Sequence, residues 1–63
     1  MYYLTLIIKG MRKLYWTGSQ VSFIRENAKE YKTHSKCERA LLKLRQTDKP
    51  EKEIFNNLMI DFD

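Results

Sequence analysis

The chain has 63 residues, a net charge of +4 and 43% hydrophobic residues, so it has room for one domain spanning residues 1–63. The single cysteine, Cys37, excludes an intrachain disulfide. Together with the single histidine, His34, it also excludes a structural zinc site built from four cysteine and histidine ligands. Stability must therefore come from packing, self-association or a partner.

The charge is unevenly distributed along the chain. Residues 1–46 carry ten lysines and arginines against three glutamates, whereas residues 47–63 carry two lysines against five acidic residues. A basic body that meets an anionic partner is one explanation of this asymmetry. A solvated surface that keeps a small protein soluble is the other.

The N-terminal region carries no pattern typical of export or of membrane insertion. Its longest apolar run, Leu4–Ile8, is interrupted by Thr5, whereas a spanning helix needs about 20 apolar residues. A signal peptide begins with basic residues, and this chain begins with Met1–Tyr3. With the unpaired Cys37, these features predict a cytoplasmic protein without a membrane partner.

β-Branched and aromatic residues predict a strand over Tyr2–Lys9, and a second strand over Arg12–Thr17 follows Gly10. A three-residue loop over residues 10–12 would place Leu6 opposite Trp16. We favour this register over that of a two-residue loop because it collects the apolar side chains on one face. That face then holds Leu4, Leu6, Ile8, Leu14 and Trp16.

The segment after the hairpin is less regular. Thr17–Gln20 has the composition of a turn. We interpret residues 21–27 as a loop that places Phe23 or Ile24 in the core, and we predict a short third strand over Ala28–Lys32.

A helix is predicted over Lys36–Gln46. Ser35 precedes Glu38 by three residues, which is the spacing of a capping box. Residues at i, i+3, i+4 and i+7 form one apolar stripe, and these are Cys37, Ala40, Leu41 and Leu44. Residues 47–50 end the helix.

Two interpretations remain open for residues 51–63. Ile54, Phe55, Leu58 and Phe62 can share a helical face. Alternatively, apolar residues alternate with polar ones from Leu58 onward, and Asn56–Asn57 is a good turn pair. We favour a turn up to Asn57 followed by a C-terminal strand. The resulting ββ(β)αβ order predicts an α+β fold, a two-layer domain in which an antiparallel sheet of three to four strands packs on one helix.

Few residues have the pattern of a catalytic or metal site. Cys37 lies in the apolar stripe, where a thiol is usually inert, and His34 lies at the helix start. Gly10 and Gly18 are isolated, so no glycine-rich phosphate-binding motif exists. We expect no enzymatic activity, no catalytic residue, no cofactor, no metal and no small-molecule substrate.

Two surfaces are candidates for partner binding. The first is the outer face of the hairpin, where the favoured register sets Lys9 opposite Lys13. An open sheet face with aromatic rings and lysines can hold single-stranded nucleic acid. Alternatively, a fourth strand, the C-terminal segment or a second copy of the chain covers it. We call this the sheet-face set, and it consists of Tyr3, Lys9, Lys13 and Tyr15.

The second candidate surface lies on the predicted helix. Three cations fall together on one flank of the apolar stripe, and Leu42 points away from that stripe. A leucine beside a basic ridge could anchor a protein contact. We call this the helix-face set, and it consists of Lys36, Arg39, Leu42 and Lys43.

The order of the segments "YWTG", "ENAKEYKT" and "SKCERALLKL", followed by an acidic C-terminal strand, resembles small uncharacterised accessory proteins of phages and prophages. The resemblance spans residues 14–44. It implies a short inhibitor or adaptor of a host or phage machine, located in the host cytoplasm if phage-encoded. Inhibitors of CRISPR nucleases are one such group; many of them are acidic, whereas this chain is basic.

The sequence therefore favours a non-enzymatic binding module that acts through protein–protein contacts, with a partner protein or a second copy of the chain as its partner. The alternative is a nucleic-acid-binding protein that uses a basic, aromatic-bearing surface.

Overall fold

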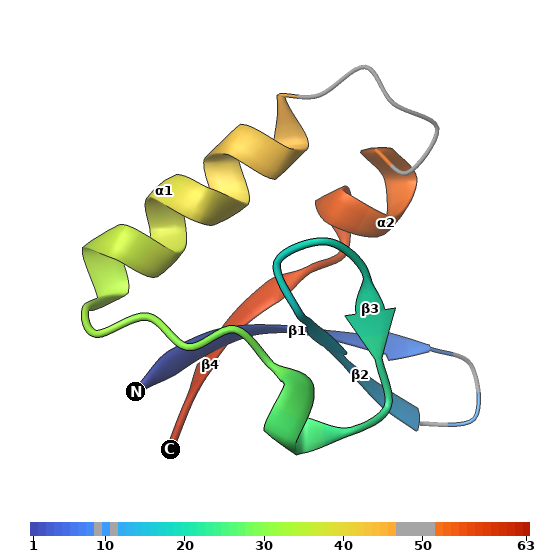
Figure 1. The fold of residues 1–63 in the computed structure, drawn as a ribbon. Helices are drawn as coiled ribbons and strands as arrows, with labels where there is room; N and C mark the ends of the chain where they lie inside the picture. The colour runs from blue at the N-terminus through green and yellow to red at the C-terminus, as the bar shows by residue number, and fades with distance from the viewer. Residues whose placement is uncertain (9, 11, 47–51) are drawn as a thin grey trace.

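The computed structural model describes residues 1–8, 10, 12–46 and 52–63. The elements are, in chain order, β1 (Tyr2–Ile8), β2 (Arg12–Trp16), β3 (Val21–Ser22), the 3-10 helix η1 (Arg25–Asn27), α1 (His34–Arg45), α2 (Lys52–Asn56) and β4 (Met59–Phe62). The four strands form one antiparallel sheet in the order β3-β2-β1-β4. Both α-helices lie on one side of this sheet (Figure 1). The predicted two-layer α+β fold is confirmed, with α2 as an additional short helix.

The β1–β2 hairpin has the predicted faces but a different register. Leu6 pairs with Leu14 rather than with Trp16. The chain turns at Gly10, whose φ of +92° lies in the left-handed region that favours glycine, so β1 ends at Ile8 and β2 begins at Arg12. A displacement by two residues leaves each side chain on its predicted face. The inner face still contributes Leu4, Leu6, Leu14 and Trp16 to the core, with Ile8 packed against them.

The new register changes the outer face of the hairpin. Ile7 lies opposite Lys13, so the predicted pairing of Lys9 with Lys13 is wrong. Lys9 itself lies outside the described residues.

The third strand is β3, not the predicted Ala28–Lys32. β3 follows β2 through a short turn, and this local pairing takes the outer edge of β2. Ala28–Lys32 contributes only one β-bridge, between Tyr31 and Tyr2. This bridge lies beside the first residues of β1, with which β2 does not pair. Phe23 and Ile24 follow β3 beyond the sheet and are 58% and 55% exposed, so the prediction that one of them enters the core is wrong.

Helix α1 begins two residues before the predicted start. Thr33 is its N-cap, and the Thr33 hydroxyl accepts a hydrogen bond of 3.2 Å from the Lys36 N–H. Ser35, the predicted cap, lies inside the first turn. The apolar stripe faces the sheet as predicted, with Cys37 and Leu41 buried and Ala40 and Leu44 partly buried.

The C-terminal segment contains both a helix and a strand, the two alternatives that the sequence left open. Residues 52–56 form the short helix α2, and β4 then pairs antiparallel with the first half of β1. The predicted C-terminal strand is confirmed. Phe55 of α2 packs edge-on against Trp16 at a centroid distance of 5.4 Å, and Leu58 is fully buried.

The cap assignment predicts different effects for two neighbouring alanine substitutions. Thr33→Ala removes the hydroxyl that accepts the Lys36 N–H, and we expect the free energy of unfolding to fall by about 1 kcal/mol. Ser35→Ala should change it by less than about 0.5 kcal/mol. Urea denaturation followed by circular dichroism measures both, and equal losses would contradict the assigned cap.

Candidate functional site

The outer face of the sheet is closed at its centre by the protein's own arginine. Helix η1 lies on the side of the sheet opposite α1 (Figure 1) and places the Arg25 guanidinium 3.9 Å from the centre of the Tyr3 ring. Tyr3 is consequently only 5% exposed, and Tyr15 beside it is partly buried. Two members of the sheet-face set thus pack inside the protein rather than presenting free rings.

The cations of this face are paired with acidic residues of the C-terminal segment. Lys13 donates a hydrogen bond of 2.6 Å to the Asp61 carboxylate. Arg25 pairs with Asp63 and, at 3.3 Å, with Glu30. The register of β4 beside β1 brings Asp61 and Asp63 to this side of the sheet, whereas Glu30 comes from the segment after η1. A polyanion could use Lys13 only by displacing its carboxylate.

The pKa values of these groups shift in the direction that such pairing requires. The hydrogen bond from Lys13, with a second from the Phe62 N–H, lowers the pKa of Asp61 below its ordinary value. The same carboxylate raises the pKa of Lys13. Burial raises the pKa of the Tyr3 hydroxyl, and the nearby Asp63 adds to that shift. Both members of the Lys13–Asp61 pair are therefore charged at neutral pH.

The helix-face set lies in solvent. Its three cations, Lys36, Arg39 and Lys43, are exposed, and Leu42 is 48% exposed. Within the described part of the chain, no salt bridge engages these cations. The structure therefore leaves this basic flank available to a partner.

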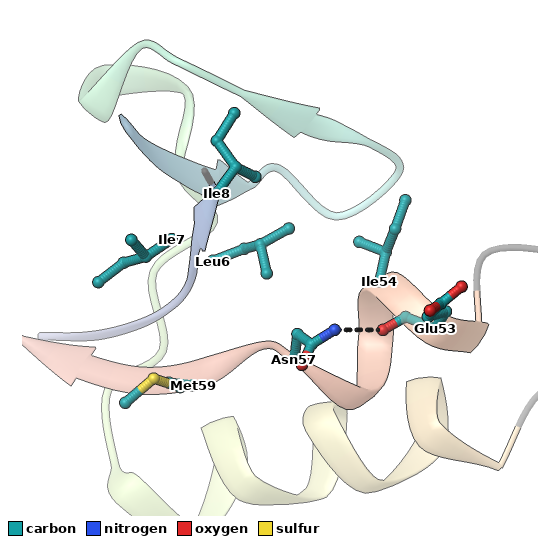
Figure 2. A pocket seen from close by; sticks show the side chains of 7 residues that line it. All are labelled: Leu6, Ile7, Ile8, Glu53, Ile54, Asn57 and Met59. Carbon is teal, nitrogen blue, oxygen red and sulfur yellow. Dashed lines mark hydrogen bonds between the residues drawn. The ribbon is translucent and has the colours of Figure 1, made fainter. Parts of the chain in front are cut away.

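A third surface, which the sequence did not predict, is an open groove between the end of β1 and helix α2. It forms because β4 pairs only with Tyr2–Thr5, whereas β1 continues to Ile8. Figure 2 shows α2 standing across from this last part of β1, with a hydrogen bond of 2.9 Å from the Asn57 amide to the Glu53 carbonyl at the end of the helix. The groove is lined by Leu6, Ile7, Ile8, Glu53, Ile54, Asn57 and Met59.

Apolar side chains dominate this groove. Ile7 is 58% exposed, Met59 is 60% exposed and Ile54 is 38% exposed. Ile7 and Met59 point to one side of β1 and Ile54 lies on the other, so exposed apolar side chains flank the groove on both sides (Figure 2). Exposed apolar surface of this kind on a small protein is typical of an interaction site. The alternation along β1 already placed Ile7 on the outer face, but the proximity of Ile54 and Met59 depends on where β4 begins. The Asn56–Asn57 turn pair predicted a strand after it, but no sequence signal indicated the register in which that strand pairs with β1.

Catalytic and metal-binding features are sparse in the described residues. They contain no group of three or more His, Cys, Asp or Glu side chains that could hold a metal ion. Cys37 is buried, and burial raises the pKa of its thiol, so the reactive thiolate is disfavoured. None of the helices in the described ranges has the length and apolar character needed to cross a membrane.

Comparison of the chain with protein-family models, with curated proteins and with solved structures found no match. Function is therefore inferred from the three surfaces alone.

The Lys13–Asp61 pair makes stability depend on pH in a defined direction. A lowered pKa of Asp61 stabilises the fold above the pKa of this group in the unfolded chain, and that contribution is lost as the pH falls through the lower pKa of the folded protein. The raised pKa of Lys13 acts conversely, contributing below its unfolded pKa and losing effect as the pH rises through the folded value. The pair therefore contributes most around neutral pH.

We expect Asp61→Asn to lower the free energy of unfolding at neutral pH by at most about 1 kcal/mol, because both partners are about a third or more exposed and solvent screens the pair. The difference from the parent protein should shrink as the pH is lowered from about 7 to about 2. Urea denaturation across this range measures it, with the exposed Glu26→Gln as the control. A pH-independent difference would show that Asp61 acts through something other than its charge.

Proposed function

We propose that this protein is a non-enzymatic protein-binding module, a small accessory or inhibitor protein of phage type, and that the groove between β1 and α2 takes an apolar segment of its partner. The observation that supports this proposal is the cluster of exposed Ile7, Ile54 and Met59 around the groove. These side chains gain from burial only when another molecule covers them.

Burial of the side chains around the groove would contribute a modest part of the free energy of binding. Full burial of an isoleucine or methionine side chain is worth about 1.5–3 kcal/mol. Because Ile7, Ile54 and Met59 are already partly buried, contact adds roughly 1 kcal/mol from each. A stable complex also needs contacts around the groove, since a standard interface covers about 800 Å² on each partner.

The electrostatics of the neighbouring sheet face favour the same class of partner. Lys13 lies directly opposite Ile7 and is neutralised by Asp61. Covering the described part of this face would therefore bury Lys13 as half of an ion pair and not as an unpaired charge, whose burial costs free energy. Glu53 adds one negative charge at the rim of the groove.

Selection from a displayed library of random peptides tests the groove directly, because it requires no identified partner. We expect the immobilised protein to enrich peptides rich in apolar residues. Ile54→Lys and Ile7→Lys should each weaken their binding at least tenfold, because each places a charge in the apolar contact; tenfold corresponds to about 1.4 kcal/mol. Fluorescence anisotropy with the selected peptides measures the dissociation constants.

Leu42→Lys is the matched control for these variants, because it introduces the same charge at an exposed apolar position on α1. It should leave the affinity of the selected peptides unchanged. No enrichment, or equal sensitivity to Leu42→Lys, would rule out the groove as the binding site.

A second candidate function, nucleic-acid binding, is supported by the helix-face set. Lys36, Arg39 and Lys43 are exposed on one flank of α1, and the segment from first to last spans about 10 Å of helix axis. Cations arranged along a ridge contact phosphates, and such binding falls steeply with salt.

This second candidate predicts a salt-dependent anisotropy increase for single-stranded or duplex oligonucleotides. Replacing Lys36, Arg39 and Lys43 together by alanine should abolish it and flatten the salt dependence. Lys13→Ala should have little effect, because Lys13 is already paired. Flat titrations of the parent protein at low salt would eliminate nucleic-acid binding.

A further inference from the structure

Strand β4 is the terminal strand of the sheet, and half of its backbone groups face outward. Met1 and Asp63 exchange backbone hydrogen bonds in both directions, at 3.4 and 3.2 Å. In an antiparallel ladder such pairs alternate along the strands. The N–H and C=O groups of Ile60 and Phe62 therefore point away from β1, toward the outer edge.

The protein itself supplies hydrogen-bond partners to backbone groups at both ends of this edge. The Leu58 carbonyl accepts a hydrogen bond of 3.1 Å from the Arg45 guanidinium, and the Phe62 N–H donates one of 2.8 Å to the Asp61 carboxylate. Between them, the N–H and C=O of Ile60 have no partner strand among the described residues. The unpaired part of the edge is thus centred on Ile60.

Exposed apolar side chains flank this unpaired position on both faces of the sheet. Phe62 is 70% exposed on the inner face, and Met59 is 60% exposed on the outer face. An edge strand with free backbone groups and apolar flanks is a template for a further strand.

We propose that a second copy of this chain pairs with the β4 edge, antiparallel and about a twofold axis at Ile60, so that two four-stranded sheets become one eight-stranded sheet. The two copies exchange the N–H and C=O groups of their Ile60 residues. This inference goes beyond the proposed function and does not depend on the groove.

A second copy can pair in this register without electrostatic repulsion. With Ile60 opposite Ile60 of the second copy, Met59 lies opposite Asp61 of that copy, and Phe62 lies opposite its Leu58. No like charges face each other. A register centred on Asp61 would instead set the two carboxylates opposite each other, which is destabilising.

The interface is expected to be small, because both backbone groups of Leu58 and the N–H of Phe62 are engaged within the protein. Only the central Ile60 pair adds backbone hydrogen bonds, and the remaining contacts are between side chains. Interfaces below the standard size are typical of transient complexes. We therefore expect a concentration-dependent monomer–dimer equilibrium rather than a permanent dimer.

Analytical ultracentrifugation from about 1 µM to about 1 mM covers the range in which weak dimers dissociate. Ile60→Pro removes the edge N–H without removing a bond to β1, because that N–H faces outward. Phe62→Lys adds a charge at the flank and changes only an exposed side chain, so it remains informative if the proline variant fails to fold. Each should weaken dimerisation at least tenfold.

Ile7→Lys is the matched control, since Ile7 is 58% exposed but lies on β1, away from the outer edge of β4. It should leave dimerisation unchanged while weakening peptide binding in the groove; Phe62→Lys should do the reverse. A strict monomer over the whole range overturns the inference. A dimer that persists in folded Phe62→Lys overturns it as well, because the contact then lies elsewhere.

Discussion

Strand β1 lies at the centre of the sheet, and its two neighbours pair with different halves of it. β2 pairs with Thr5–Ile8, and β4 pairs with Tyr2–Thr5. A strand within a sheet needs hydrogen-bond partners for its backbone groups on both sides. Each half of β1 therefore has one side without a neighbouring strand, and these two unpaired sides determine much of the remaining structure. Tyr31 fills the vacancy beside Tyr2. The vacancy beside Ile8 stays open and becomes the groove across from α2 (Figure 2).

The C-terminal segment decides what the outer face of the sheet can bind. β4 brings Asp61 and Asp63 next to Lys13 and Arg25, so acidic residues from one end of the chain neutralise cations from the other. Among the described residues of this face, carboxylates thereby compensate the charges of Lys13 and Arg25, although the sequence is basic on average. Positive charge with no described ion pair remains on the exposed flank of α1, on the other side of the sheet from that face.

The two proposed contacts use different surfaces of the protein. The groove presents side chains to an apolar segment, whereas the β4 edge presents backbone groups to another strand. Both arise because a domain of this size has too little interior to bury every apolar residue. Ile7, Met59 and Phe62 are among the residues that stay outside, and each lies where a strand ends or a sheet stops.

The sequence alone determined the α+β class, the alternation that buries Leu4, Leu6, Leu14 and Trp16, the apolar stripe of α1 and the strand at the C-terminus. These depend on periodicity, which is local and survives a register shift of two residues. Tertiary structure alone decided the register at Gly10, the choice of β3 over Ala28–Lys32 and the stacking of Arg25 on Tyr3. It also decided that Ile7, Ile54 and Met59 line one groove. Each of these is a contact between segments distant in sequence or a competition between turns, and residue spacing along one strand or helix carries no information about either.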